Sequence, residues 1–283
     1  GPVTSFGTDQ NSVSLGMIDI ALKKTTGKTS FVAEVSFGPR GQYQSIVNTP
    51  GVVFDANGDV LPGISTSGES FNIQNLYVTY AATDKLSFTA GYMGTFIGYE
   101  VISPVANFHY STSYLFTNGP FQNAGVKANY AFSDKVGLMV GGFNSSWNFY
   151  SADPMKGLNA IGAQLSLTPT EGISAYLNFM DGSESGTIVD LTATFQLSEK
   201  FKLGLNITDN FGLGLRGEYF KFKEGSGDTS VTAFTLSANL KAGGLTVIPE
   251  FRLDSGKDDL FLDSDLTPTK SFSQASIALV YGF

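Results

Sequence analysis

The chain has 283 residues, a net charge of −8 at neutral pH and no cysteine. The acidic balance argues against nucleic acid as a partner, and the lack of cysteine excludes disulfides, thiol catalysis and cysteine-ligated metals. Only 15% of the residues are charged, whereas soluble domains carry roughly 25%. The apolar runs are shorter than the 18 or so residues of a membrane helix, so a membrane location requires a β-barrel.

Stretches in which apolar and polar residues alternate follow one another along the whole chain, and this period of two predicts β-strands. Most are about 9 to 13 residues long, the length that a tilted strand needs to cross a bilayer. The predicted fold is all-β, a single transmembrane antiparallel up-and-down barrel over residues 1–283. We expect about 14 strands, at residues 14–24, 29–38, 71–82, 85–94, 121–132, 135–144, 158–168, 172–181, 187–197, 200–208, 211–223, 230–241, 245–254 and 272–283.

The connectors alternate between short and long, as in outer-membrane barrels with short periplasmic turns and long external loops. We expect the long external loops near residues 39–70, 95–120, 145–157 and 255–271. The last strand, FSQASIALVYGF, ends on the aromatic residue Phe283. An exposed strand edge invites mispairing in a soluble protein, whereas a closed barrel pairs its last strand with an early one.

Counting the strands from the two ends gives opposite orientations for the connector at Asp209 and Asn210. Counting from the early turns makes this connector external, and counting back from Phe283 makes it periplasmic. The two counts agree if one strand is absent between Asn206 and Ile207. The early turns also place the start of the first strand outside, whereas both termini of such barrels lie in the periplasm, so a second strand is expected to be absent before Ser14. Both absences are expected to arise from residues that are deleted or left out. The intact barrel then has 16 strands, an even number that is common among porins.

The alternation separates two faces in each strand. In GVKANYAF we expect Val126 and Tyr130 to face lipid, and Lys127 and Asn129 to face inward. Polar inward residues are typical of a water-filled lumen. Opposite charges that share a face, such as Arg216 and Glu218, indicate either a transverse electric field in the pore or pairwise neutralisation inside the barrel wall. The expected lumen-lining residues are Lys127, Asn129, Asp190, Arg216, Glu218, Glu250 and Arg252.

The segment 95–120 is the strongest candidate for a functional site, because it is long and rich in hydrogen-bonding groups. It can fold inward and narrow the lumen, or pack outward on the rim. Its pore-constriction candidates are Tyr99, Glu100, Asn107, His109 and Tyr110. Glu100 can attract cations in a narrow passage of low dielectric constant, or it can be a salt-bridged structural residue.

The sequence predicts no catalytic residue, metal site or cofactor. His109 is the only histidine, and a single loop histidine is more often a hydrogen-bonding residue than a ligand or base. The sequence DANGD at 55–59 resembles the start of a calcium loop, but its glycine is misplaced for an EF-hand and no bidentate glutamate follows.

Three segments resemble one protein family. These are NSVSLGMIDIALKKTTGKTSFVAEVSFGPR at 11–40, the stretch 88–141 with its GYE core and GPF entry to the next hairpin, and FGLGLRGEYF at 211–220. They are similar to the putative β-barrel porin-2, OmpL-like group of Bacteroidota-type bacteria. The resemblance covers most of the chain, with the two absent strands as departures. It implies a passive channel in the outer membrane of a Gram-negative bacterium.

The leading interpretation is therefore a porin through which small hydrophilic solutes or ions diffuse, and not an enzyme. The alternative is a structural or scaffold barrel, a subunit of a larger outer-membrane assembly with a plugged lumen. The expected partners are outer-membrane lipids, lipopolysaccharide and the solutes themselves, with no nucleic acid. The sequence leaves open whether the protein forms homo-oligomers or joins partner proteins in a membrane complex.

Overall fold

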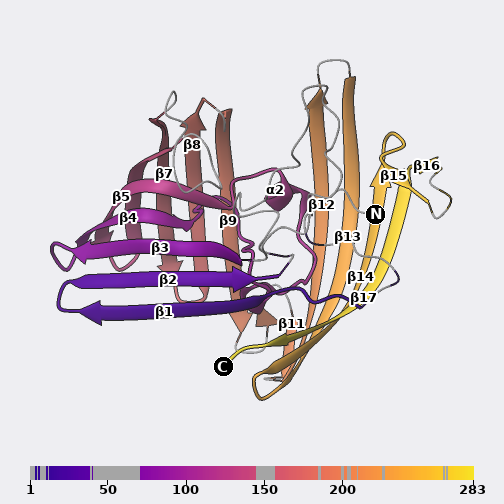
Figure 1. The fold of residues 1–283 in the computed structure, drawn as a ribbon, viewed down its shortest axis with the longest axis horizontal. Coiled ribbons are helices and arrows are strands. Elements are labelled where there is room, and N and C mark those ends of the chain that lie inside the picture. Colours follow the sequence, from indigo (N-terminus) through magenta and orange to yellow (C-terminus); the bar gives the residue numbers. More distant parts are fainter. Residues whose placement is uncertain are drawn as a thin grey trace, which may run out of the picture.

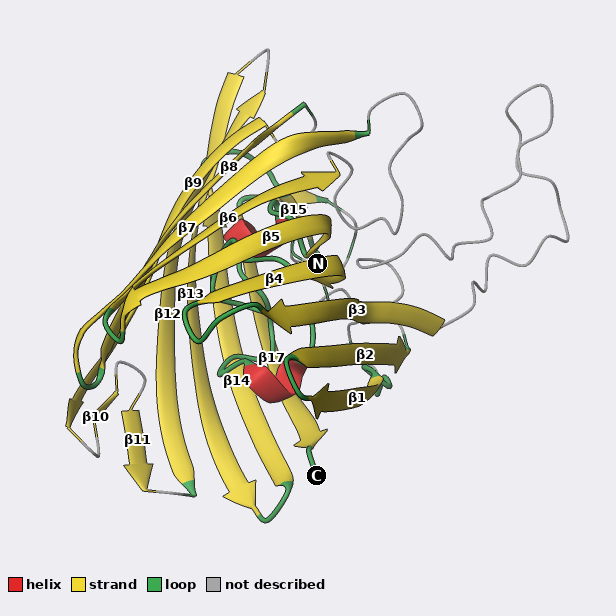
Figure 2. Ribbon diagram, turned by 90° about the vertical axis from the view of Figure 1, so that its left-hand side faces the viewer, coloured by secondary structure: helices red, strands yellow, loops and turns green. Residues whose placement is uncertain are grey.

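Figures 1 and 2 show the fold in a computed structural model. It describes residues 4, 6, 11, 13–38, 40, 71–144, 157–183, 186–198, 201–202, 205–208, 210–224, 227–263, 265 and 267–283. Apart from Arg40 and Gly157, the predicted loops at 39–70 and 145–157 lie outside these residues, as does the DANGD sequence. Among the described residues, no helix is long and apolar enough to span a membrane.

The strands form two large antiparallel sheets in which neighbours in sequence are neighbours in space. The first sheet has ten strands in chain order: β1 (Ile18–Thr26), β2 (Thr29–Phe37), β3 (Phe71–Ala81), β4 (Leu86–Gly94), β5 (Gln122–Ser133), β6 (Val136–Asn144), β7 (Leu158–Thr170), β8 (Ile173–Gly182), β9 (Gly186–Ser198) and β10 (Phe201–Lys202). The second has five: β11 (Leu205–Thr208), β12 (Phe211–Glu224), β13 (Gly227–Ala242), β14 (Leu245–Gly256) and β17 (Ser271–Tyr281). A small hairpin, β15 (Phe261–Leu262) and β16 (Pro268–Thr269), precedes β17. The predicted all-β, up-and-down fold is confirmed.

The two sheets curve into one wall around a central space (Figure 2). Apolar side chains of the wall point outward: Val126 and Phe132 on β5 are 52% and 54% exposed. Polar side chains of the inner face, such as Asn72, Gln122 and Asn178, are buried. An apolar outer surface around a polar interior is the arrangement of a barrel in lipid, and it follows from the period-two alternation of each strand.

The single strand predicted at 200–208 is wrong, because the chain forms two short strands there. β10 pairs with β9, and β11 pairs with β12. β10 and β11 belong to different sheets, and β9 and β11 run in the same direction (Figure 2). The chain therefore has one more strand here than was predicted, and this strand removes the conflict between the two strand counts. Asn206 and Ile207 are consecutive residues of β11, so the idea that residues are left out between them is also wrong.

The wall is open along a seam between β1 and β17. In the described part of the chain, β1 pairs only with β2, and β17 pairs only with β14. A cavity of about 2450 Å³ lies along these two edges, and the segment 100–106 also lines it. The strand pairing is also interrupted between β10 and β11, which belong to different sheets. The fifteen wall strands therefore form a barrel that is not closed, whereas 16 strands were predicted for the intact protein.

Candidate functional site

The segment 95–120 lies inside the curved wall, between β4 and β5 (Figures 1 and 2). It contains two short helices, η1 (Pro104–Ala106) and α2 (Tyr114–Thr117). Pro104 suits the first position of η1 because its ring fixes φ near the helical value. Ser113 caps α2, since its hydroxyl oxygen accepts a hydrogen bond from the Phe116 N–H at 3.0 Å. The segment folds into the lumen instead of packing on the rim.

The start of the segment is attached to the β6–β9 side of the wall. Ile97 packs in an apolar cluster with Phe143 of β6 and Met180 of β8. The next residue, Gly98, donates its N–H to the Asp190 carboxylate of β9 at 2.8 Å. Asp190 is 8% exposed, and this bond compensates part of the cost of burying its charge.

The middle of the segment is attached to the opposite side of the wall, on β12–β14. The Glu250 carboxylate accepts the N–H groups of Tyr110 and Ser111, both at 2.9 Å, and the Ser237 hydroxyl at 2.7 Å. Four more bonds join the segment to these strands: Asn239 to the Phe108 carbonyl, Arg252 to the Thr112 carbonyl, the Tyr114 N–H to Glu218, and the Tyr114 hydroxyl to Asp254.

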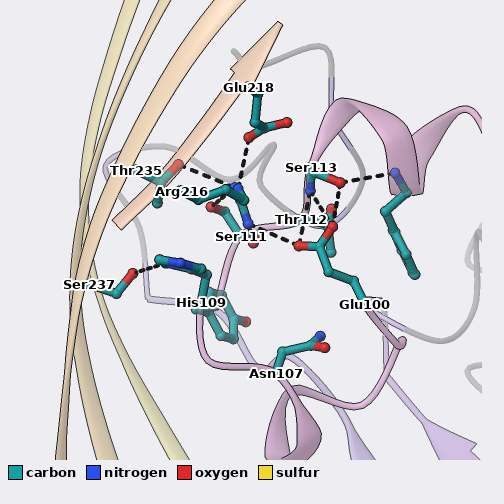
Figure 3. Close-up of polar contacts among 12 residues, drawn as sticks. Glu100, Asn107, His109, Ser111, Thr112, Ser113, Arg216, Glu218, Thr235 and Ser237 are labelled. Atoms are coloured by element: carbon teal, nitrogen blue, oxygen red, sulfur yellow. Dashed lines mark hydrogen bonds and ion pairs between the residues drawn. The ribbon is translucent and has the colours of Figure 1, made fainter. Parts of the chain in front are cut away.

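Arg216 of β12 is the centre of the ionic network (Figure 3). Its guanidinium pairs with Glu100 of the segment at 2.9 Å and with Glu218 of its own strand at 2.8 Å. It also donates to the Ser111 carbonyl at 2.7 Å. Glu100 accepts the N–H and hydroxyl of Ser113 as well. The Glu100 charge is thus compensated inside the network, as the structural interpretation of this residue predicts.

Arg252 of β14 forms a second ion pair beside this network. Its Nε donates to Asp254 at 2.7 Å, and its Nη2 lies 3.8 Å from Glu218. The guanidinium also lies over the Tyr114 ring, 5.1 Å from the centroid. Arg252 has no measurable exposure, so these contacts are what makes burial of its charge tolerable.

A histidine, a serine and a carboxylate converge at His109, Ser237 and Glu250. His109 Nδ1 lies 2.7 Å from the Ser237 hydroxyl, which in turn donates to Glu250 at 2.7 Å. A hydroxyl has one proton, so His109 donates to Ser237 and does not act as its base. In a catalytic triad the histidine stands between the serine and the carboxylate. Here the serine is in the middle, and it is only 1% exposed.

Burial and the neighbouring Arg216 lower the pKa of His109 to about 4. The Glu250 carboxylate, 3.9 Å from His109 Nδ1, raises this pKa. Burial has the larger effect, so the imidazole is neutral at neutral pH. A neutral imidazole is consistent with its role as the hydrogen-bond donor to Ser237.

The remaining predicted residues lie apart from the network. Tyr99 is 60% exposed. The Asn107 side chain accepts from the Val101 N–H and donates to the Val101 carbonyl, so it closes a local loop. Lys127 and Asn129 lie partly buried on β5, and none of the contacts described above involves them.

Asp254, Tyr114 and Arg40 are among the residues of the site that were not predicted candidates. Asp254 continues the inward series of Glu250 and Arg252 at a spacing of two, so the alternation contains the signal for it. Arg40 follows β2, where its Nε and Nη1 donate to the carbonyls of Ile102 and Tyr110 at 2.7 and 3.1 Å. No local pattern marks it, except that the chain has only three arginines.

Comparison with known proteins gives a family and weaker likenesses in structure. The model of the putative β-barrel porin-2, OmpL-like family matches residues 1–208 and 205–283. No curated protein matches the sequence. The trimer form of OmpT from Vibrio cholerae has a TM-score of 0.37 at 11% identity, over 96% of this chain and 91% of that one. A BenF-like porin from Pseudomonas fluorescens Pf-5 has a TM-score of 0.35 at 12% identity, over 86% and 61%.

The two matched stretches together cover the whole chain, and they meet at β11. The overlap of the two stretches therefore lies where the chain passes from the first sheet to the second. The curved wall of antiparallel strands agrees with the β-barrel that the family's description names. The chain belongs to the putative β-barrel porin-2, OmpL-like family, and the protein is a porin of the Gram-negative outer membrane.

Proposed function

We propose that the segment 95–120 is the constriction of this porin, past which small hydrophilic solutes and ions diffuse passively. The observation that supports the proposal is the attachment of the segment to two opposite sides of the wall, through Asp190 on β9 and Glu250 on β14. A segment held at its start and at its middle across a lumen reduces the width of the passage.

The predicted residues take different parts in this proposal. The segment is held on the wall by Asp190, Glu218, Glu250 and Arg252. Arg216 joins the wall to Glu100 of the segment. The passage runs beside the segment through the large cavity, to which Glu100 and Tyr110 contribute. We propose Tyr99, Asn107 and His109 as further residues of the constriction, and Lys127 and Asn129 as lining on the β5 side.

A segment across the lumen is equally what the scaffold alternative requires, so conductance must decide between the two. The proposed function is a channel without chemistry of its own. Its apolar outer face suits lipid, and we propose outer-membrane lipids and lipopolysaccharide as its surroundings. Reconstituted, folded protein that carries no ion current in a planar bilayer would contradict the channel and favour the scaffold.

The constriction is tested by releasing the segment from β14 with Glu250→Gln. Glutamine keeps the size of the side chain but replaces one acceptor oxygen with an NH₂ donor, which opposes one of the two N–H groups of Tyr110 and Ser111. Hydrogen bonds to a charged group are worth about 1.5–3 kcal/mol each, so the segment should loosen. We expect single-channel conductance and current noise to rise.

The matched control is Glu171→Gln, which makes the same change in the exposed β7–β8 turn and should leave the conductance at the wild-type value. Limited proteolysis reports whether the segment is released. A Glu250→Gln protein whose segment is cleaved readily but whose conductance is unchanged would show that the segment does not constrict the channel.

A further inference from the structure

Arg40 differs from the other two arginines in the partners of its charge. Arg216 and Arg252 each contact carboxylates at 2.7–2.9 Å. Arg40 donates to two backbone carbonyls and forms no ion pair with a described carboxylate. Its guanidinium lies between the rings of Phe6 and Tyr110, 4.7 Å from each centroid. Ring faces attract a cation but do not neutralise it.

The Arg40 side chain also has an unused donor. It is 3% exposed, and Nη2 has no hydrogen-bond partner within the described part of the chain. Leaving a buried charged donor without a partner is costly. The same is true of the hydroxyl of Thr4, which is 4% exposed and has no partner among the described residues. Thr4 is two residues from Phe6, whose ring covers the Arg40 guanidinium.

Arg40 and Thr4 both line the large cavity beside the constriction. Each can donate a hydrogen bond, and one of them carries a positive charge. An anionic oxygen group accepts such bonds and supplies the missing charge, and charge-assisted bonds of this kind are about twice as strong as neutral ones. We propose that Arg40 and Thr4 form a binding subsite for one anionic oxygen group, a carboxylate or a phosphate, of a solute in the cavity.

The carboxylates near Arg40 do not already occupy this subsite. Glu100 and Glu250 also line the cavity, but Glu100 is bound to Arg216 and Ser113, and Glu250 to two backbone N–H groups and Ser237. Asp19 lies beside Ser103, Glu34 and Lys23. These acids disfavour anions elsewhere in the cavity. Lys23 also lines the cavity but is exposed on β1, so Arg40 is the buried positive charge at which an anion binds most favourably.

The inference rests on the proposed function, because a solute reaches Arg40 through an open lumen. The test measures block of single-channel KCl current by sodium benzoate, by inorganic phosphate and by the uncharged amide benzamide. Benzoate or phosphate should block the wild-type channel. Comparing the half-blocking concentrations of the two anions shows whether the subsite prefers a carboxylate or a phosphate. Benzamide should not block.

Arg40→Gln should raise the half-blocking concentration by about 10-fold or more and increase the preference for K⁺ over Cl⁻. Thr4→Val, which replaces only the hydroxyl, should raise the half-blocking concentration by a few-fold. Arg40→Lys should bind the anion more tightly than Arg40→Gln does. Lys135→Gln, the same loss of charge in the β5–β6 turn, should change nothing.

Two results would overturn the subsite. One is a conducting wild-type channel that neither anion blocks. The other is block that is unchanged in conducting Arg40→Gln and Thr4→Val channels. Wild-type protein that carries no KCl current is a different outcome, because it contradicts the proposed function itself.

Discussion

Arg216 and Arg252 show how single residues fix the segment inside the lumen. Each guanidinium satisfies wall carboxylates and a backbone carbonyl of the segment at once. Buried charges are tolerated only when they are paired and hydrogen-bonded. The charges that alternate along β12 and β14 therefore neutralise one another and the segment, which favours the neutralisation interpretation over an uncompensated transverse field.

His109 gives a prediction about pH, because its folded pKa of about 4 lies below the ordinary value of 6.5. As pH falls from 6.5 to 4, the unfolded chain binds a proton that the folded protein does not, so stability decreases over this range. The loss should be on the order of 2 kcal/mol at pH 4.5. His109→Gln, which cannot titrate, should lose less stability than the wild type between pH 7.5 and 4.5.

Urea unfolding in detergent at the two pH values measures this difference. The carboxylates titrate in both proteins, so only the difference between them reports on His109. Identical losses of stability in wild type and His109→Gln would contradict a depressed pKa. Since the imidazole is neutral above about pH 5, we also expect no change in ion selectivity from this residue between pH 6 and 8.

At the scale of elements, the segment 95–120 is held by two unlike contacts. On β12–β14 it is held by ions and hydrogen bonds, whereas on β6–β9 it is held mainly by apolar packing. Phe96 packs against the cluster of Ile97 and Phe143, and its ring centroid is 5.6 Å from that of Phe143. A glycine of β7, Gly162, makes room for both rings.

Gly162→Ala tests the apolar attachment. A Cβ at this position would lie 2.5 Å from the Phe96 ring and 2.9 Å from the Phe143 ring, so the aromatic side chains must shift. Overpacking of this kind costs about 1–3 kcal/mol. We expect lower stability to urea and faster proteolysis within the segment.

The control is Gly94→Ala on β4, where the nearest atom to an added Cβ is 3.8 Å away. This variant should resemble the wild type, because that distance is ordinary van der Waals contact. Equal proteolysis of the two variants would show that packing on β7 does not hold the segment.

The elements that alternation marks most clearly were the ones predicted from the sequence. β5 was expected at 121–132 and is found at Gln122–Ser133. β10 and β11 were missed because FKLGLNIT alternates as one strand would, and the two strands are too short to show a reversal. The inward residues of β12 and β14 were also predicted. Their partners in the segment were not, since a bond between Arg216 and Glu100 depends on long-range packing.

At the scale of the whole molecule, the direction of the strands determines what can close the wall. β1 and β9 run the same way, since strands alternate in the first sheet, and β9 runs with β11 (Figure 2). β11 and β17 also run the same way in the second sheet. The two edges of the seam are therefore parallel, and a single antiparallel strand between them would give the even number that closed antiparallel barrels have.

A synthetic strand should therefore insert into the seam. Both edges expose apolar side chains on the outer face, among them Leu22 on β1 and Leu279 on β17, which are 64% and 72% exposed. We expect a ten-residue peptide of alternating apolar and polar residues, added during refolding, to bind both edges and to raise the unfolding temperature. The gain in stability comes from backbone hydrogen bonds between the peptide and each edge, whose N–H and C=O groups otherwise face solvent or lipid.

The native chain has no cysteine, so a cysteine at the centre of the peptide can be tested against Leu22→Cys and Leu279→Cys separately. A strand in the seam should form a disulfide with each variant, whereas a scrambled peptide of the same composition should form little with either. A peptide that cross-links to one edge alone would show that the seam is too wide for one strand. Only a strand whose alternation matches the wall can place apolar residues toward lipid and polar residues toward the lumen at once. Equal cross-linking of the scrambled peptide would therefore show that the alternating peptide contacts the edges non-specifically.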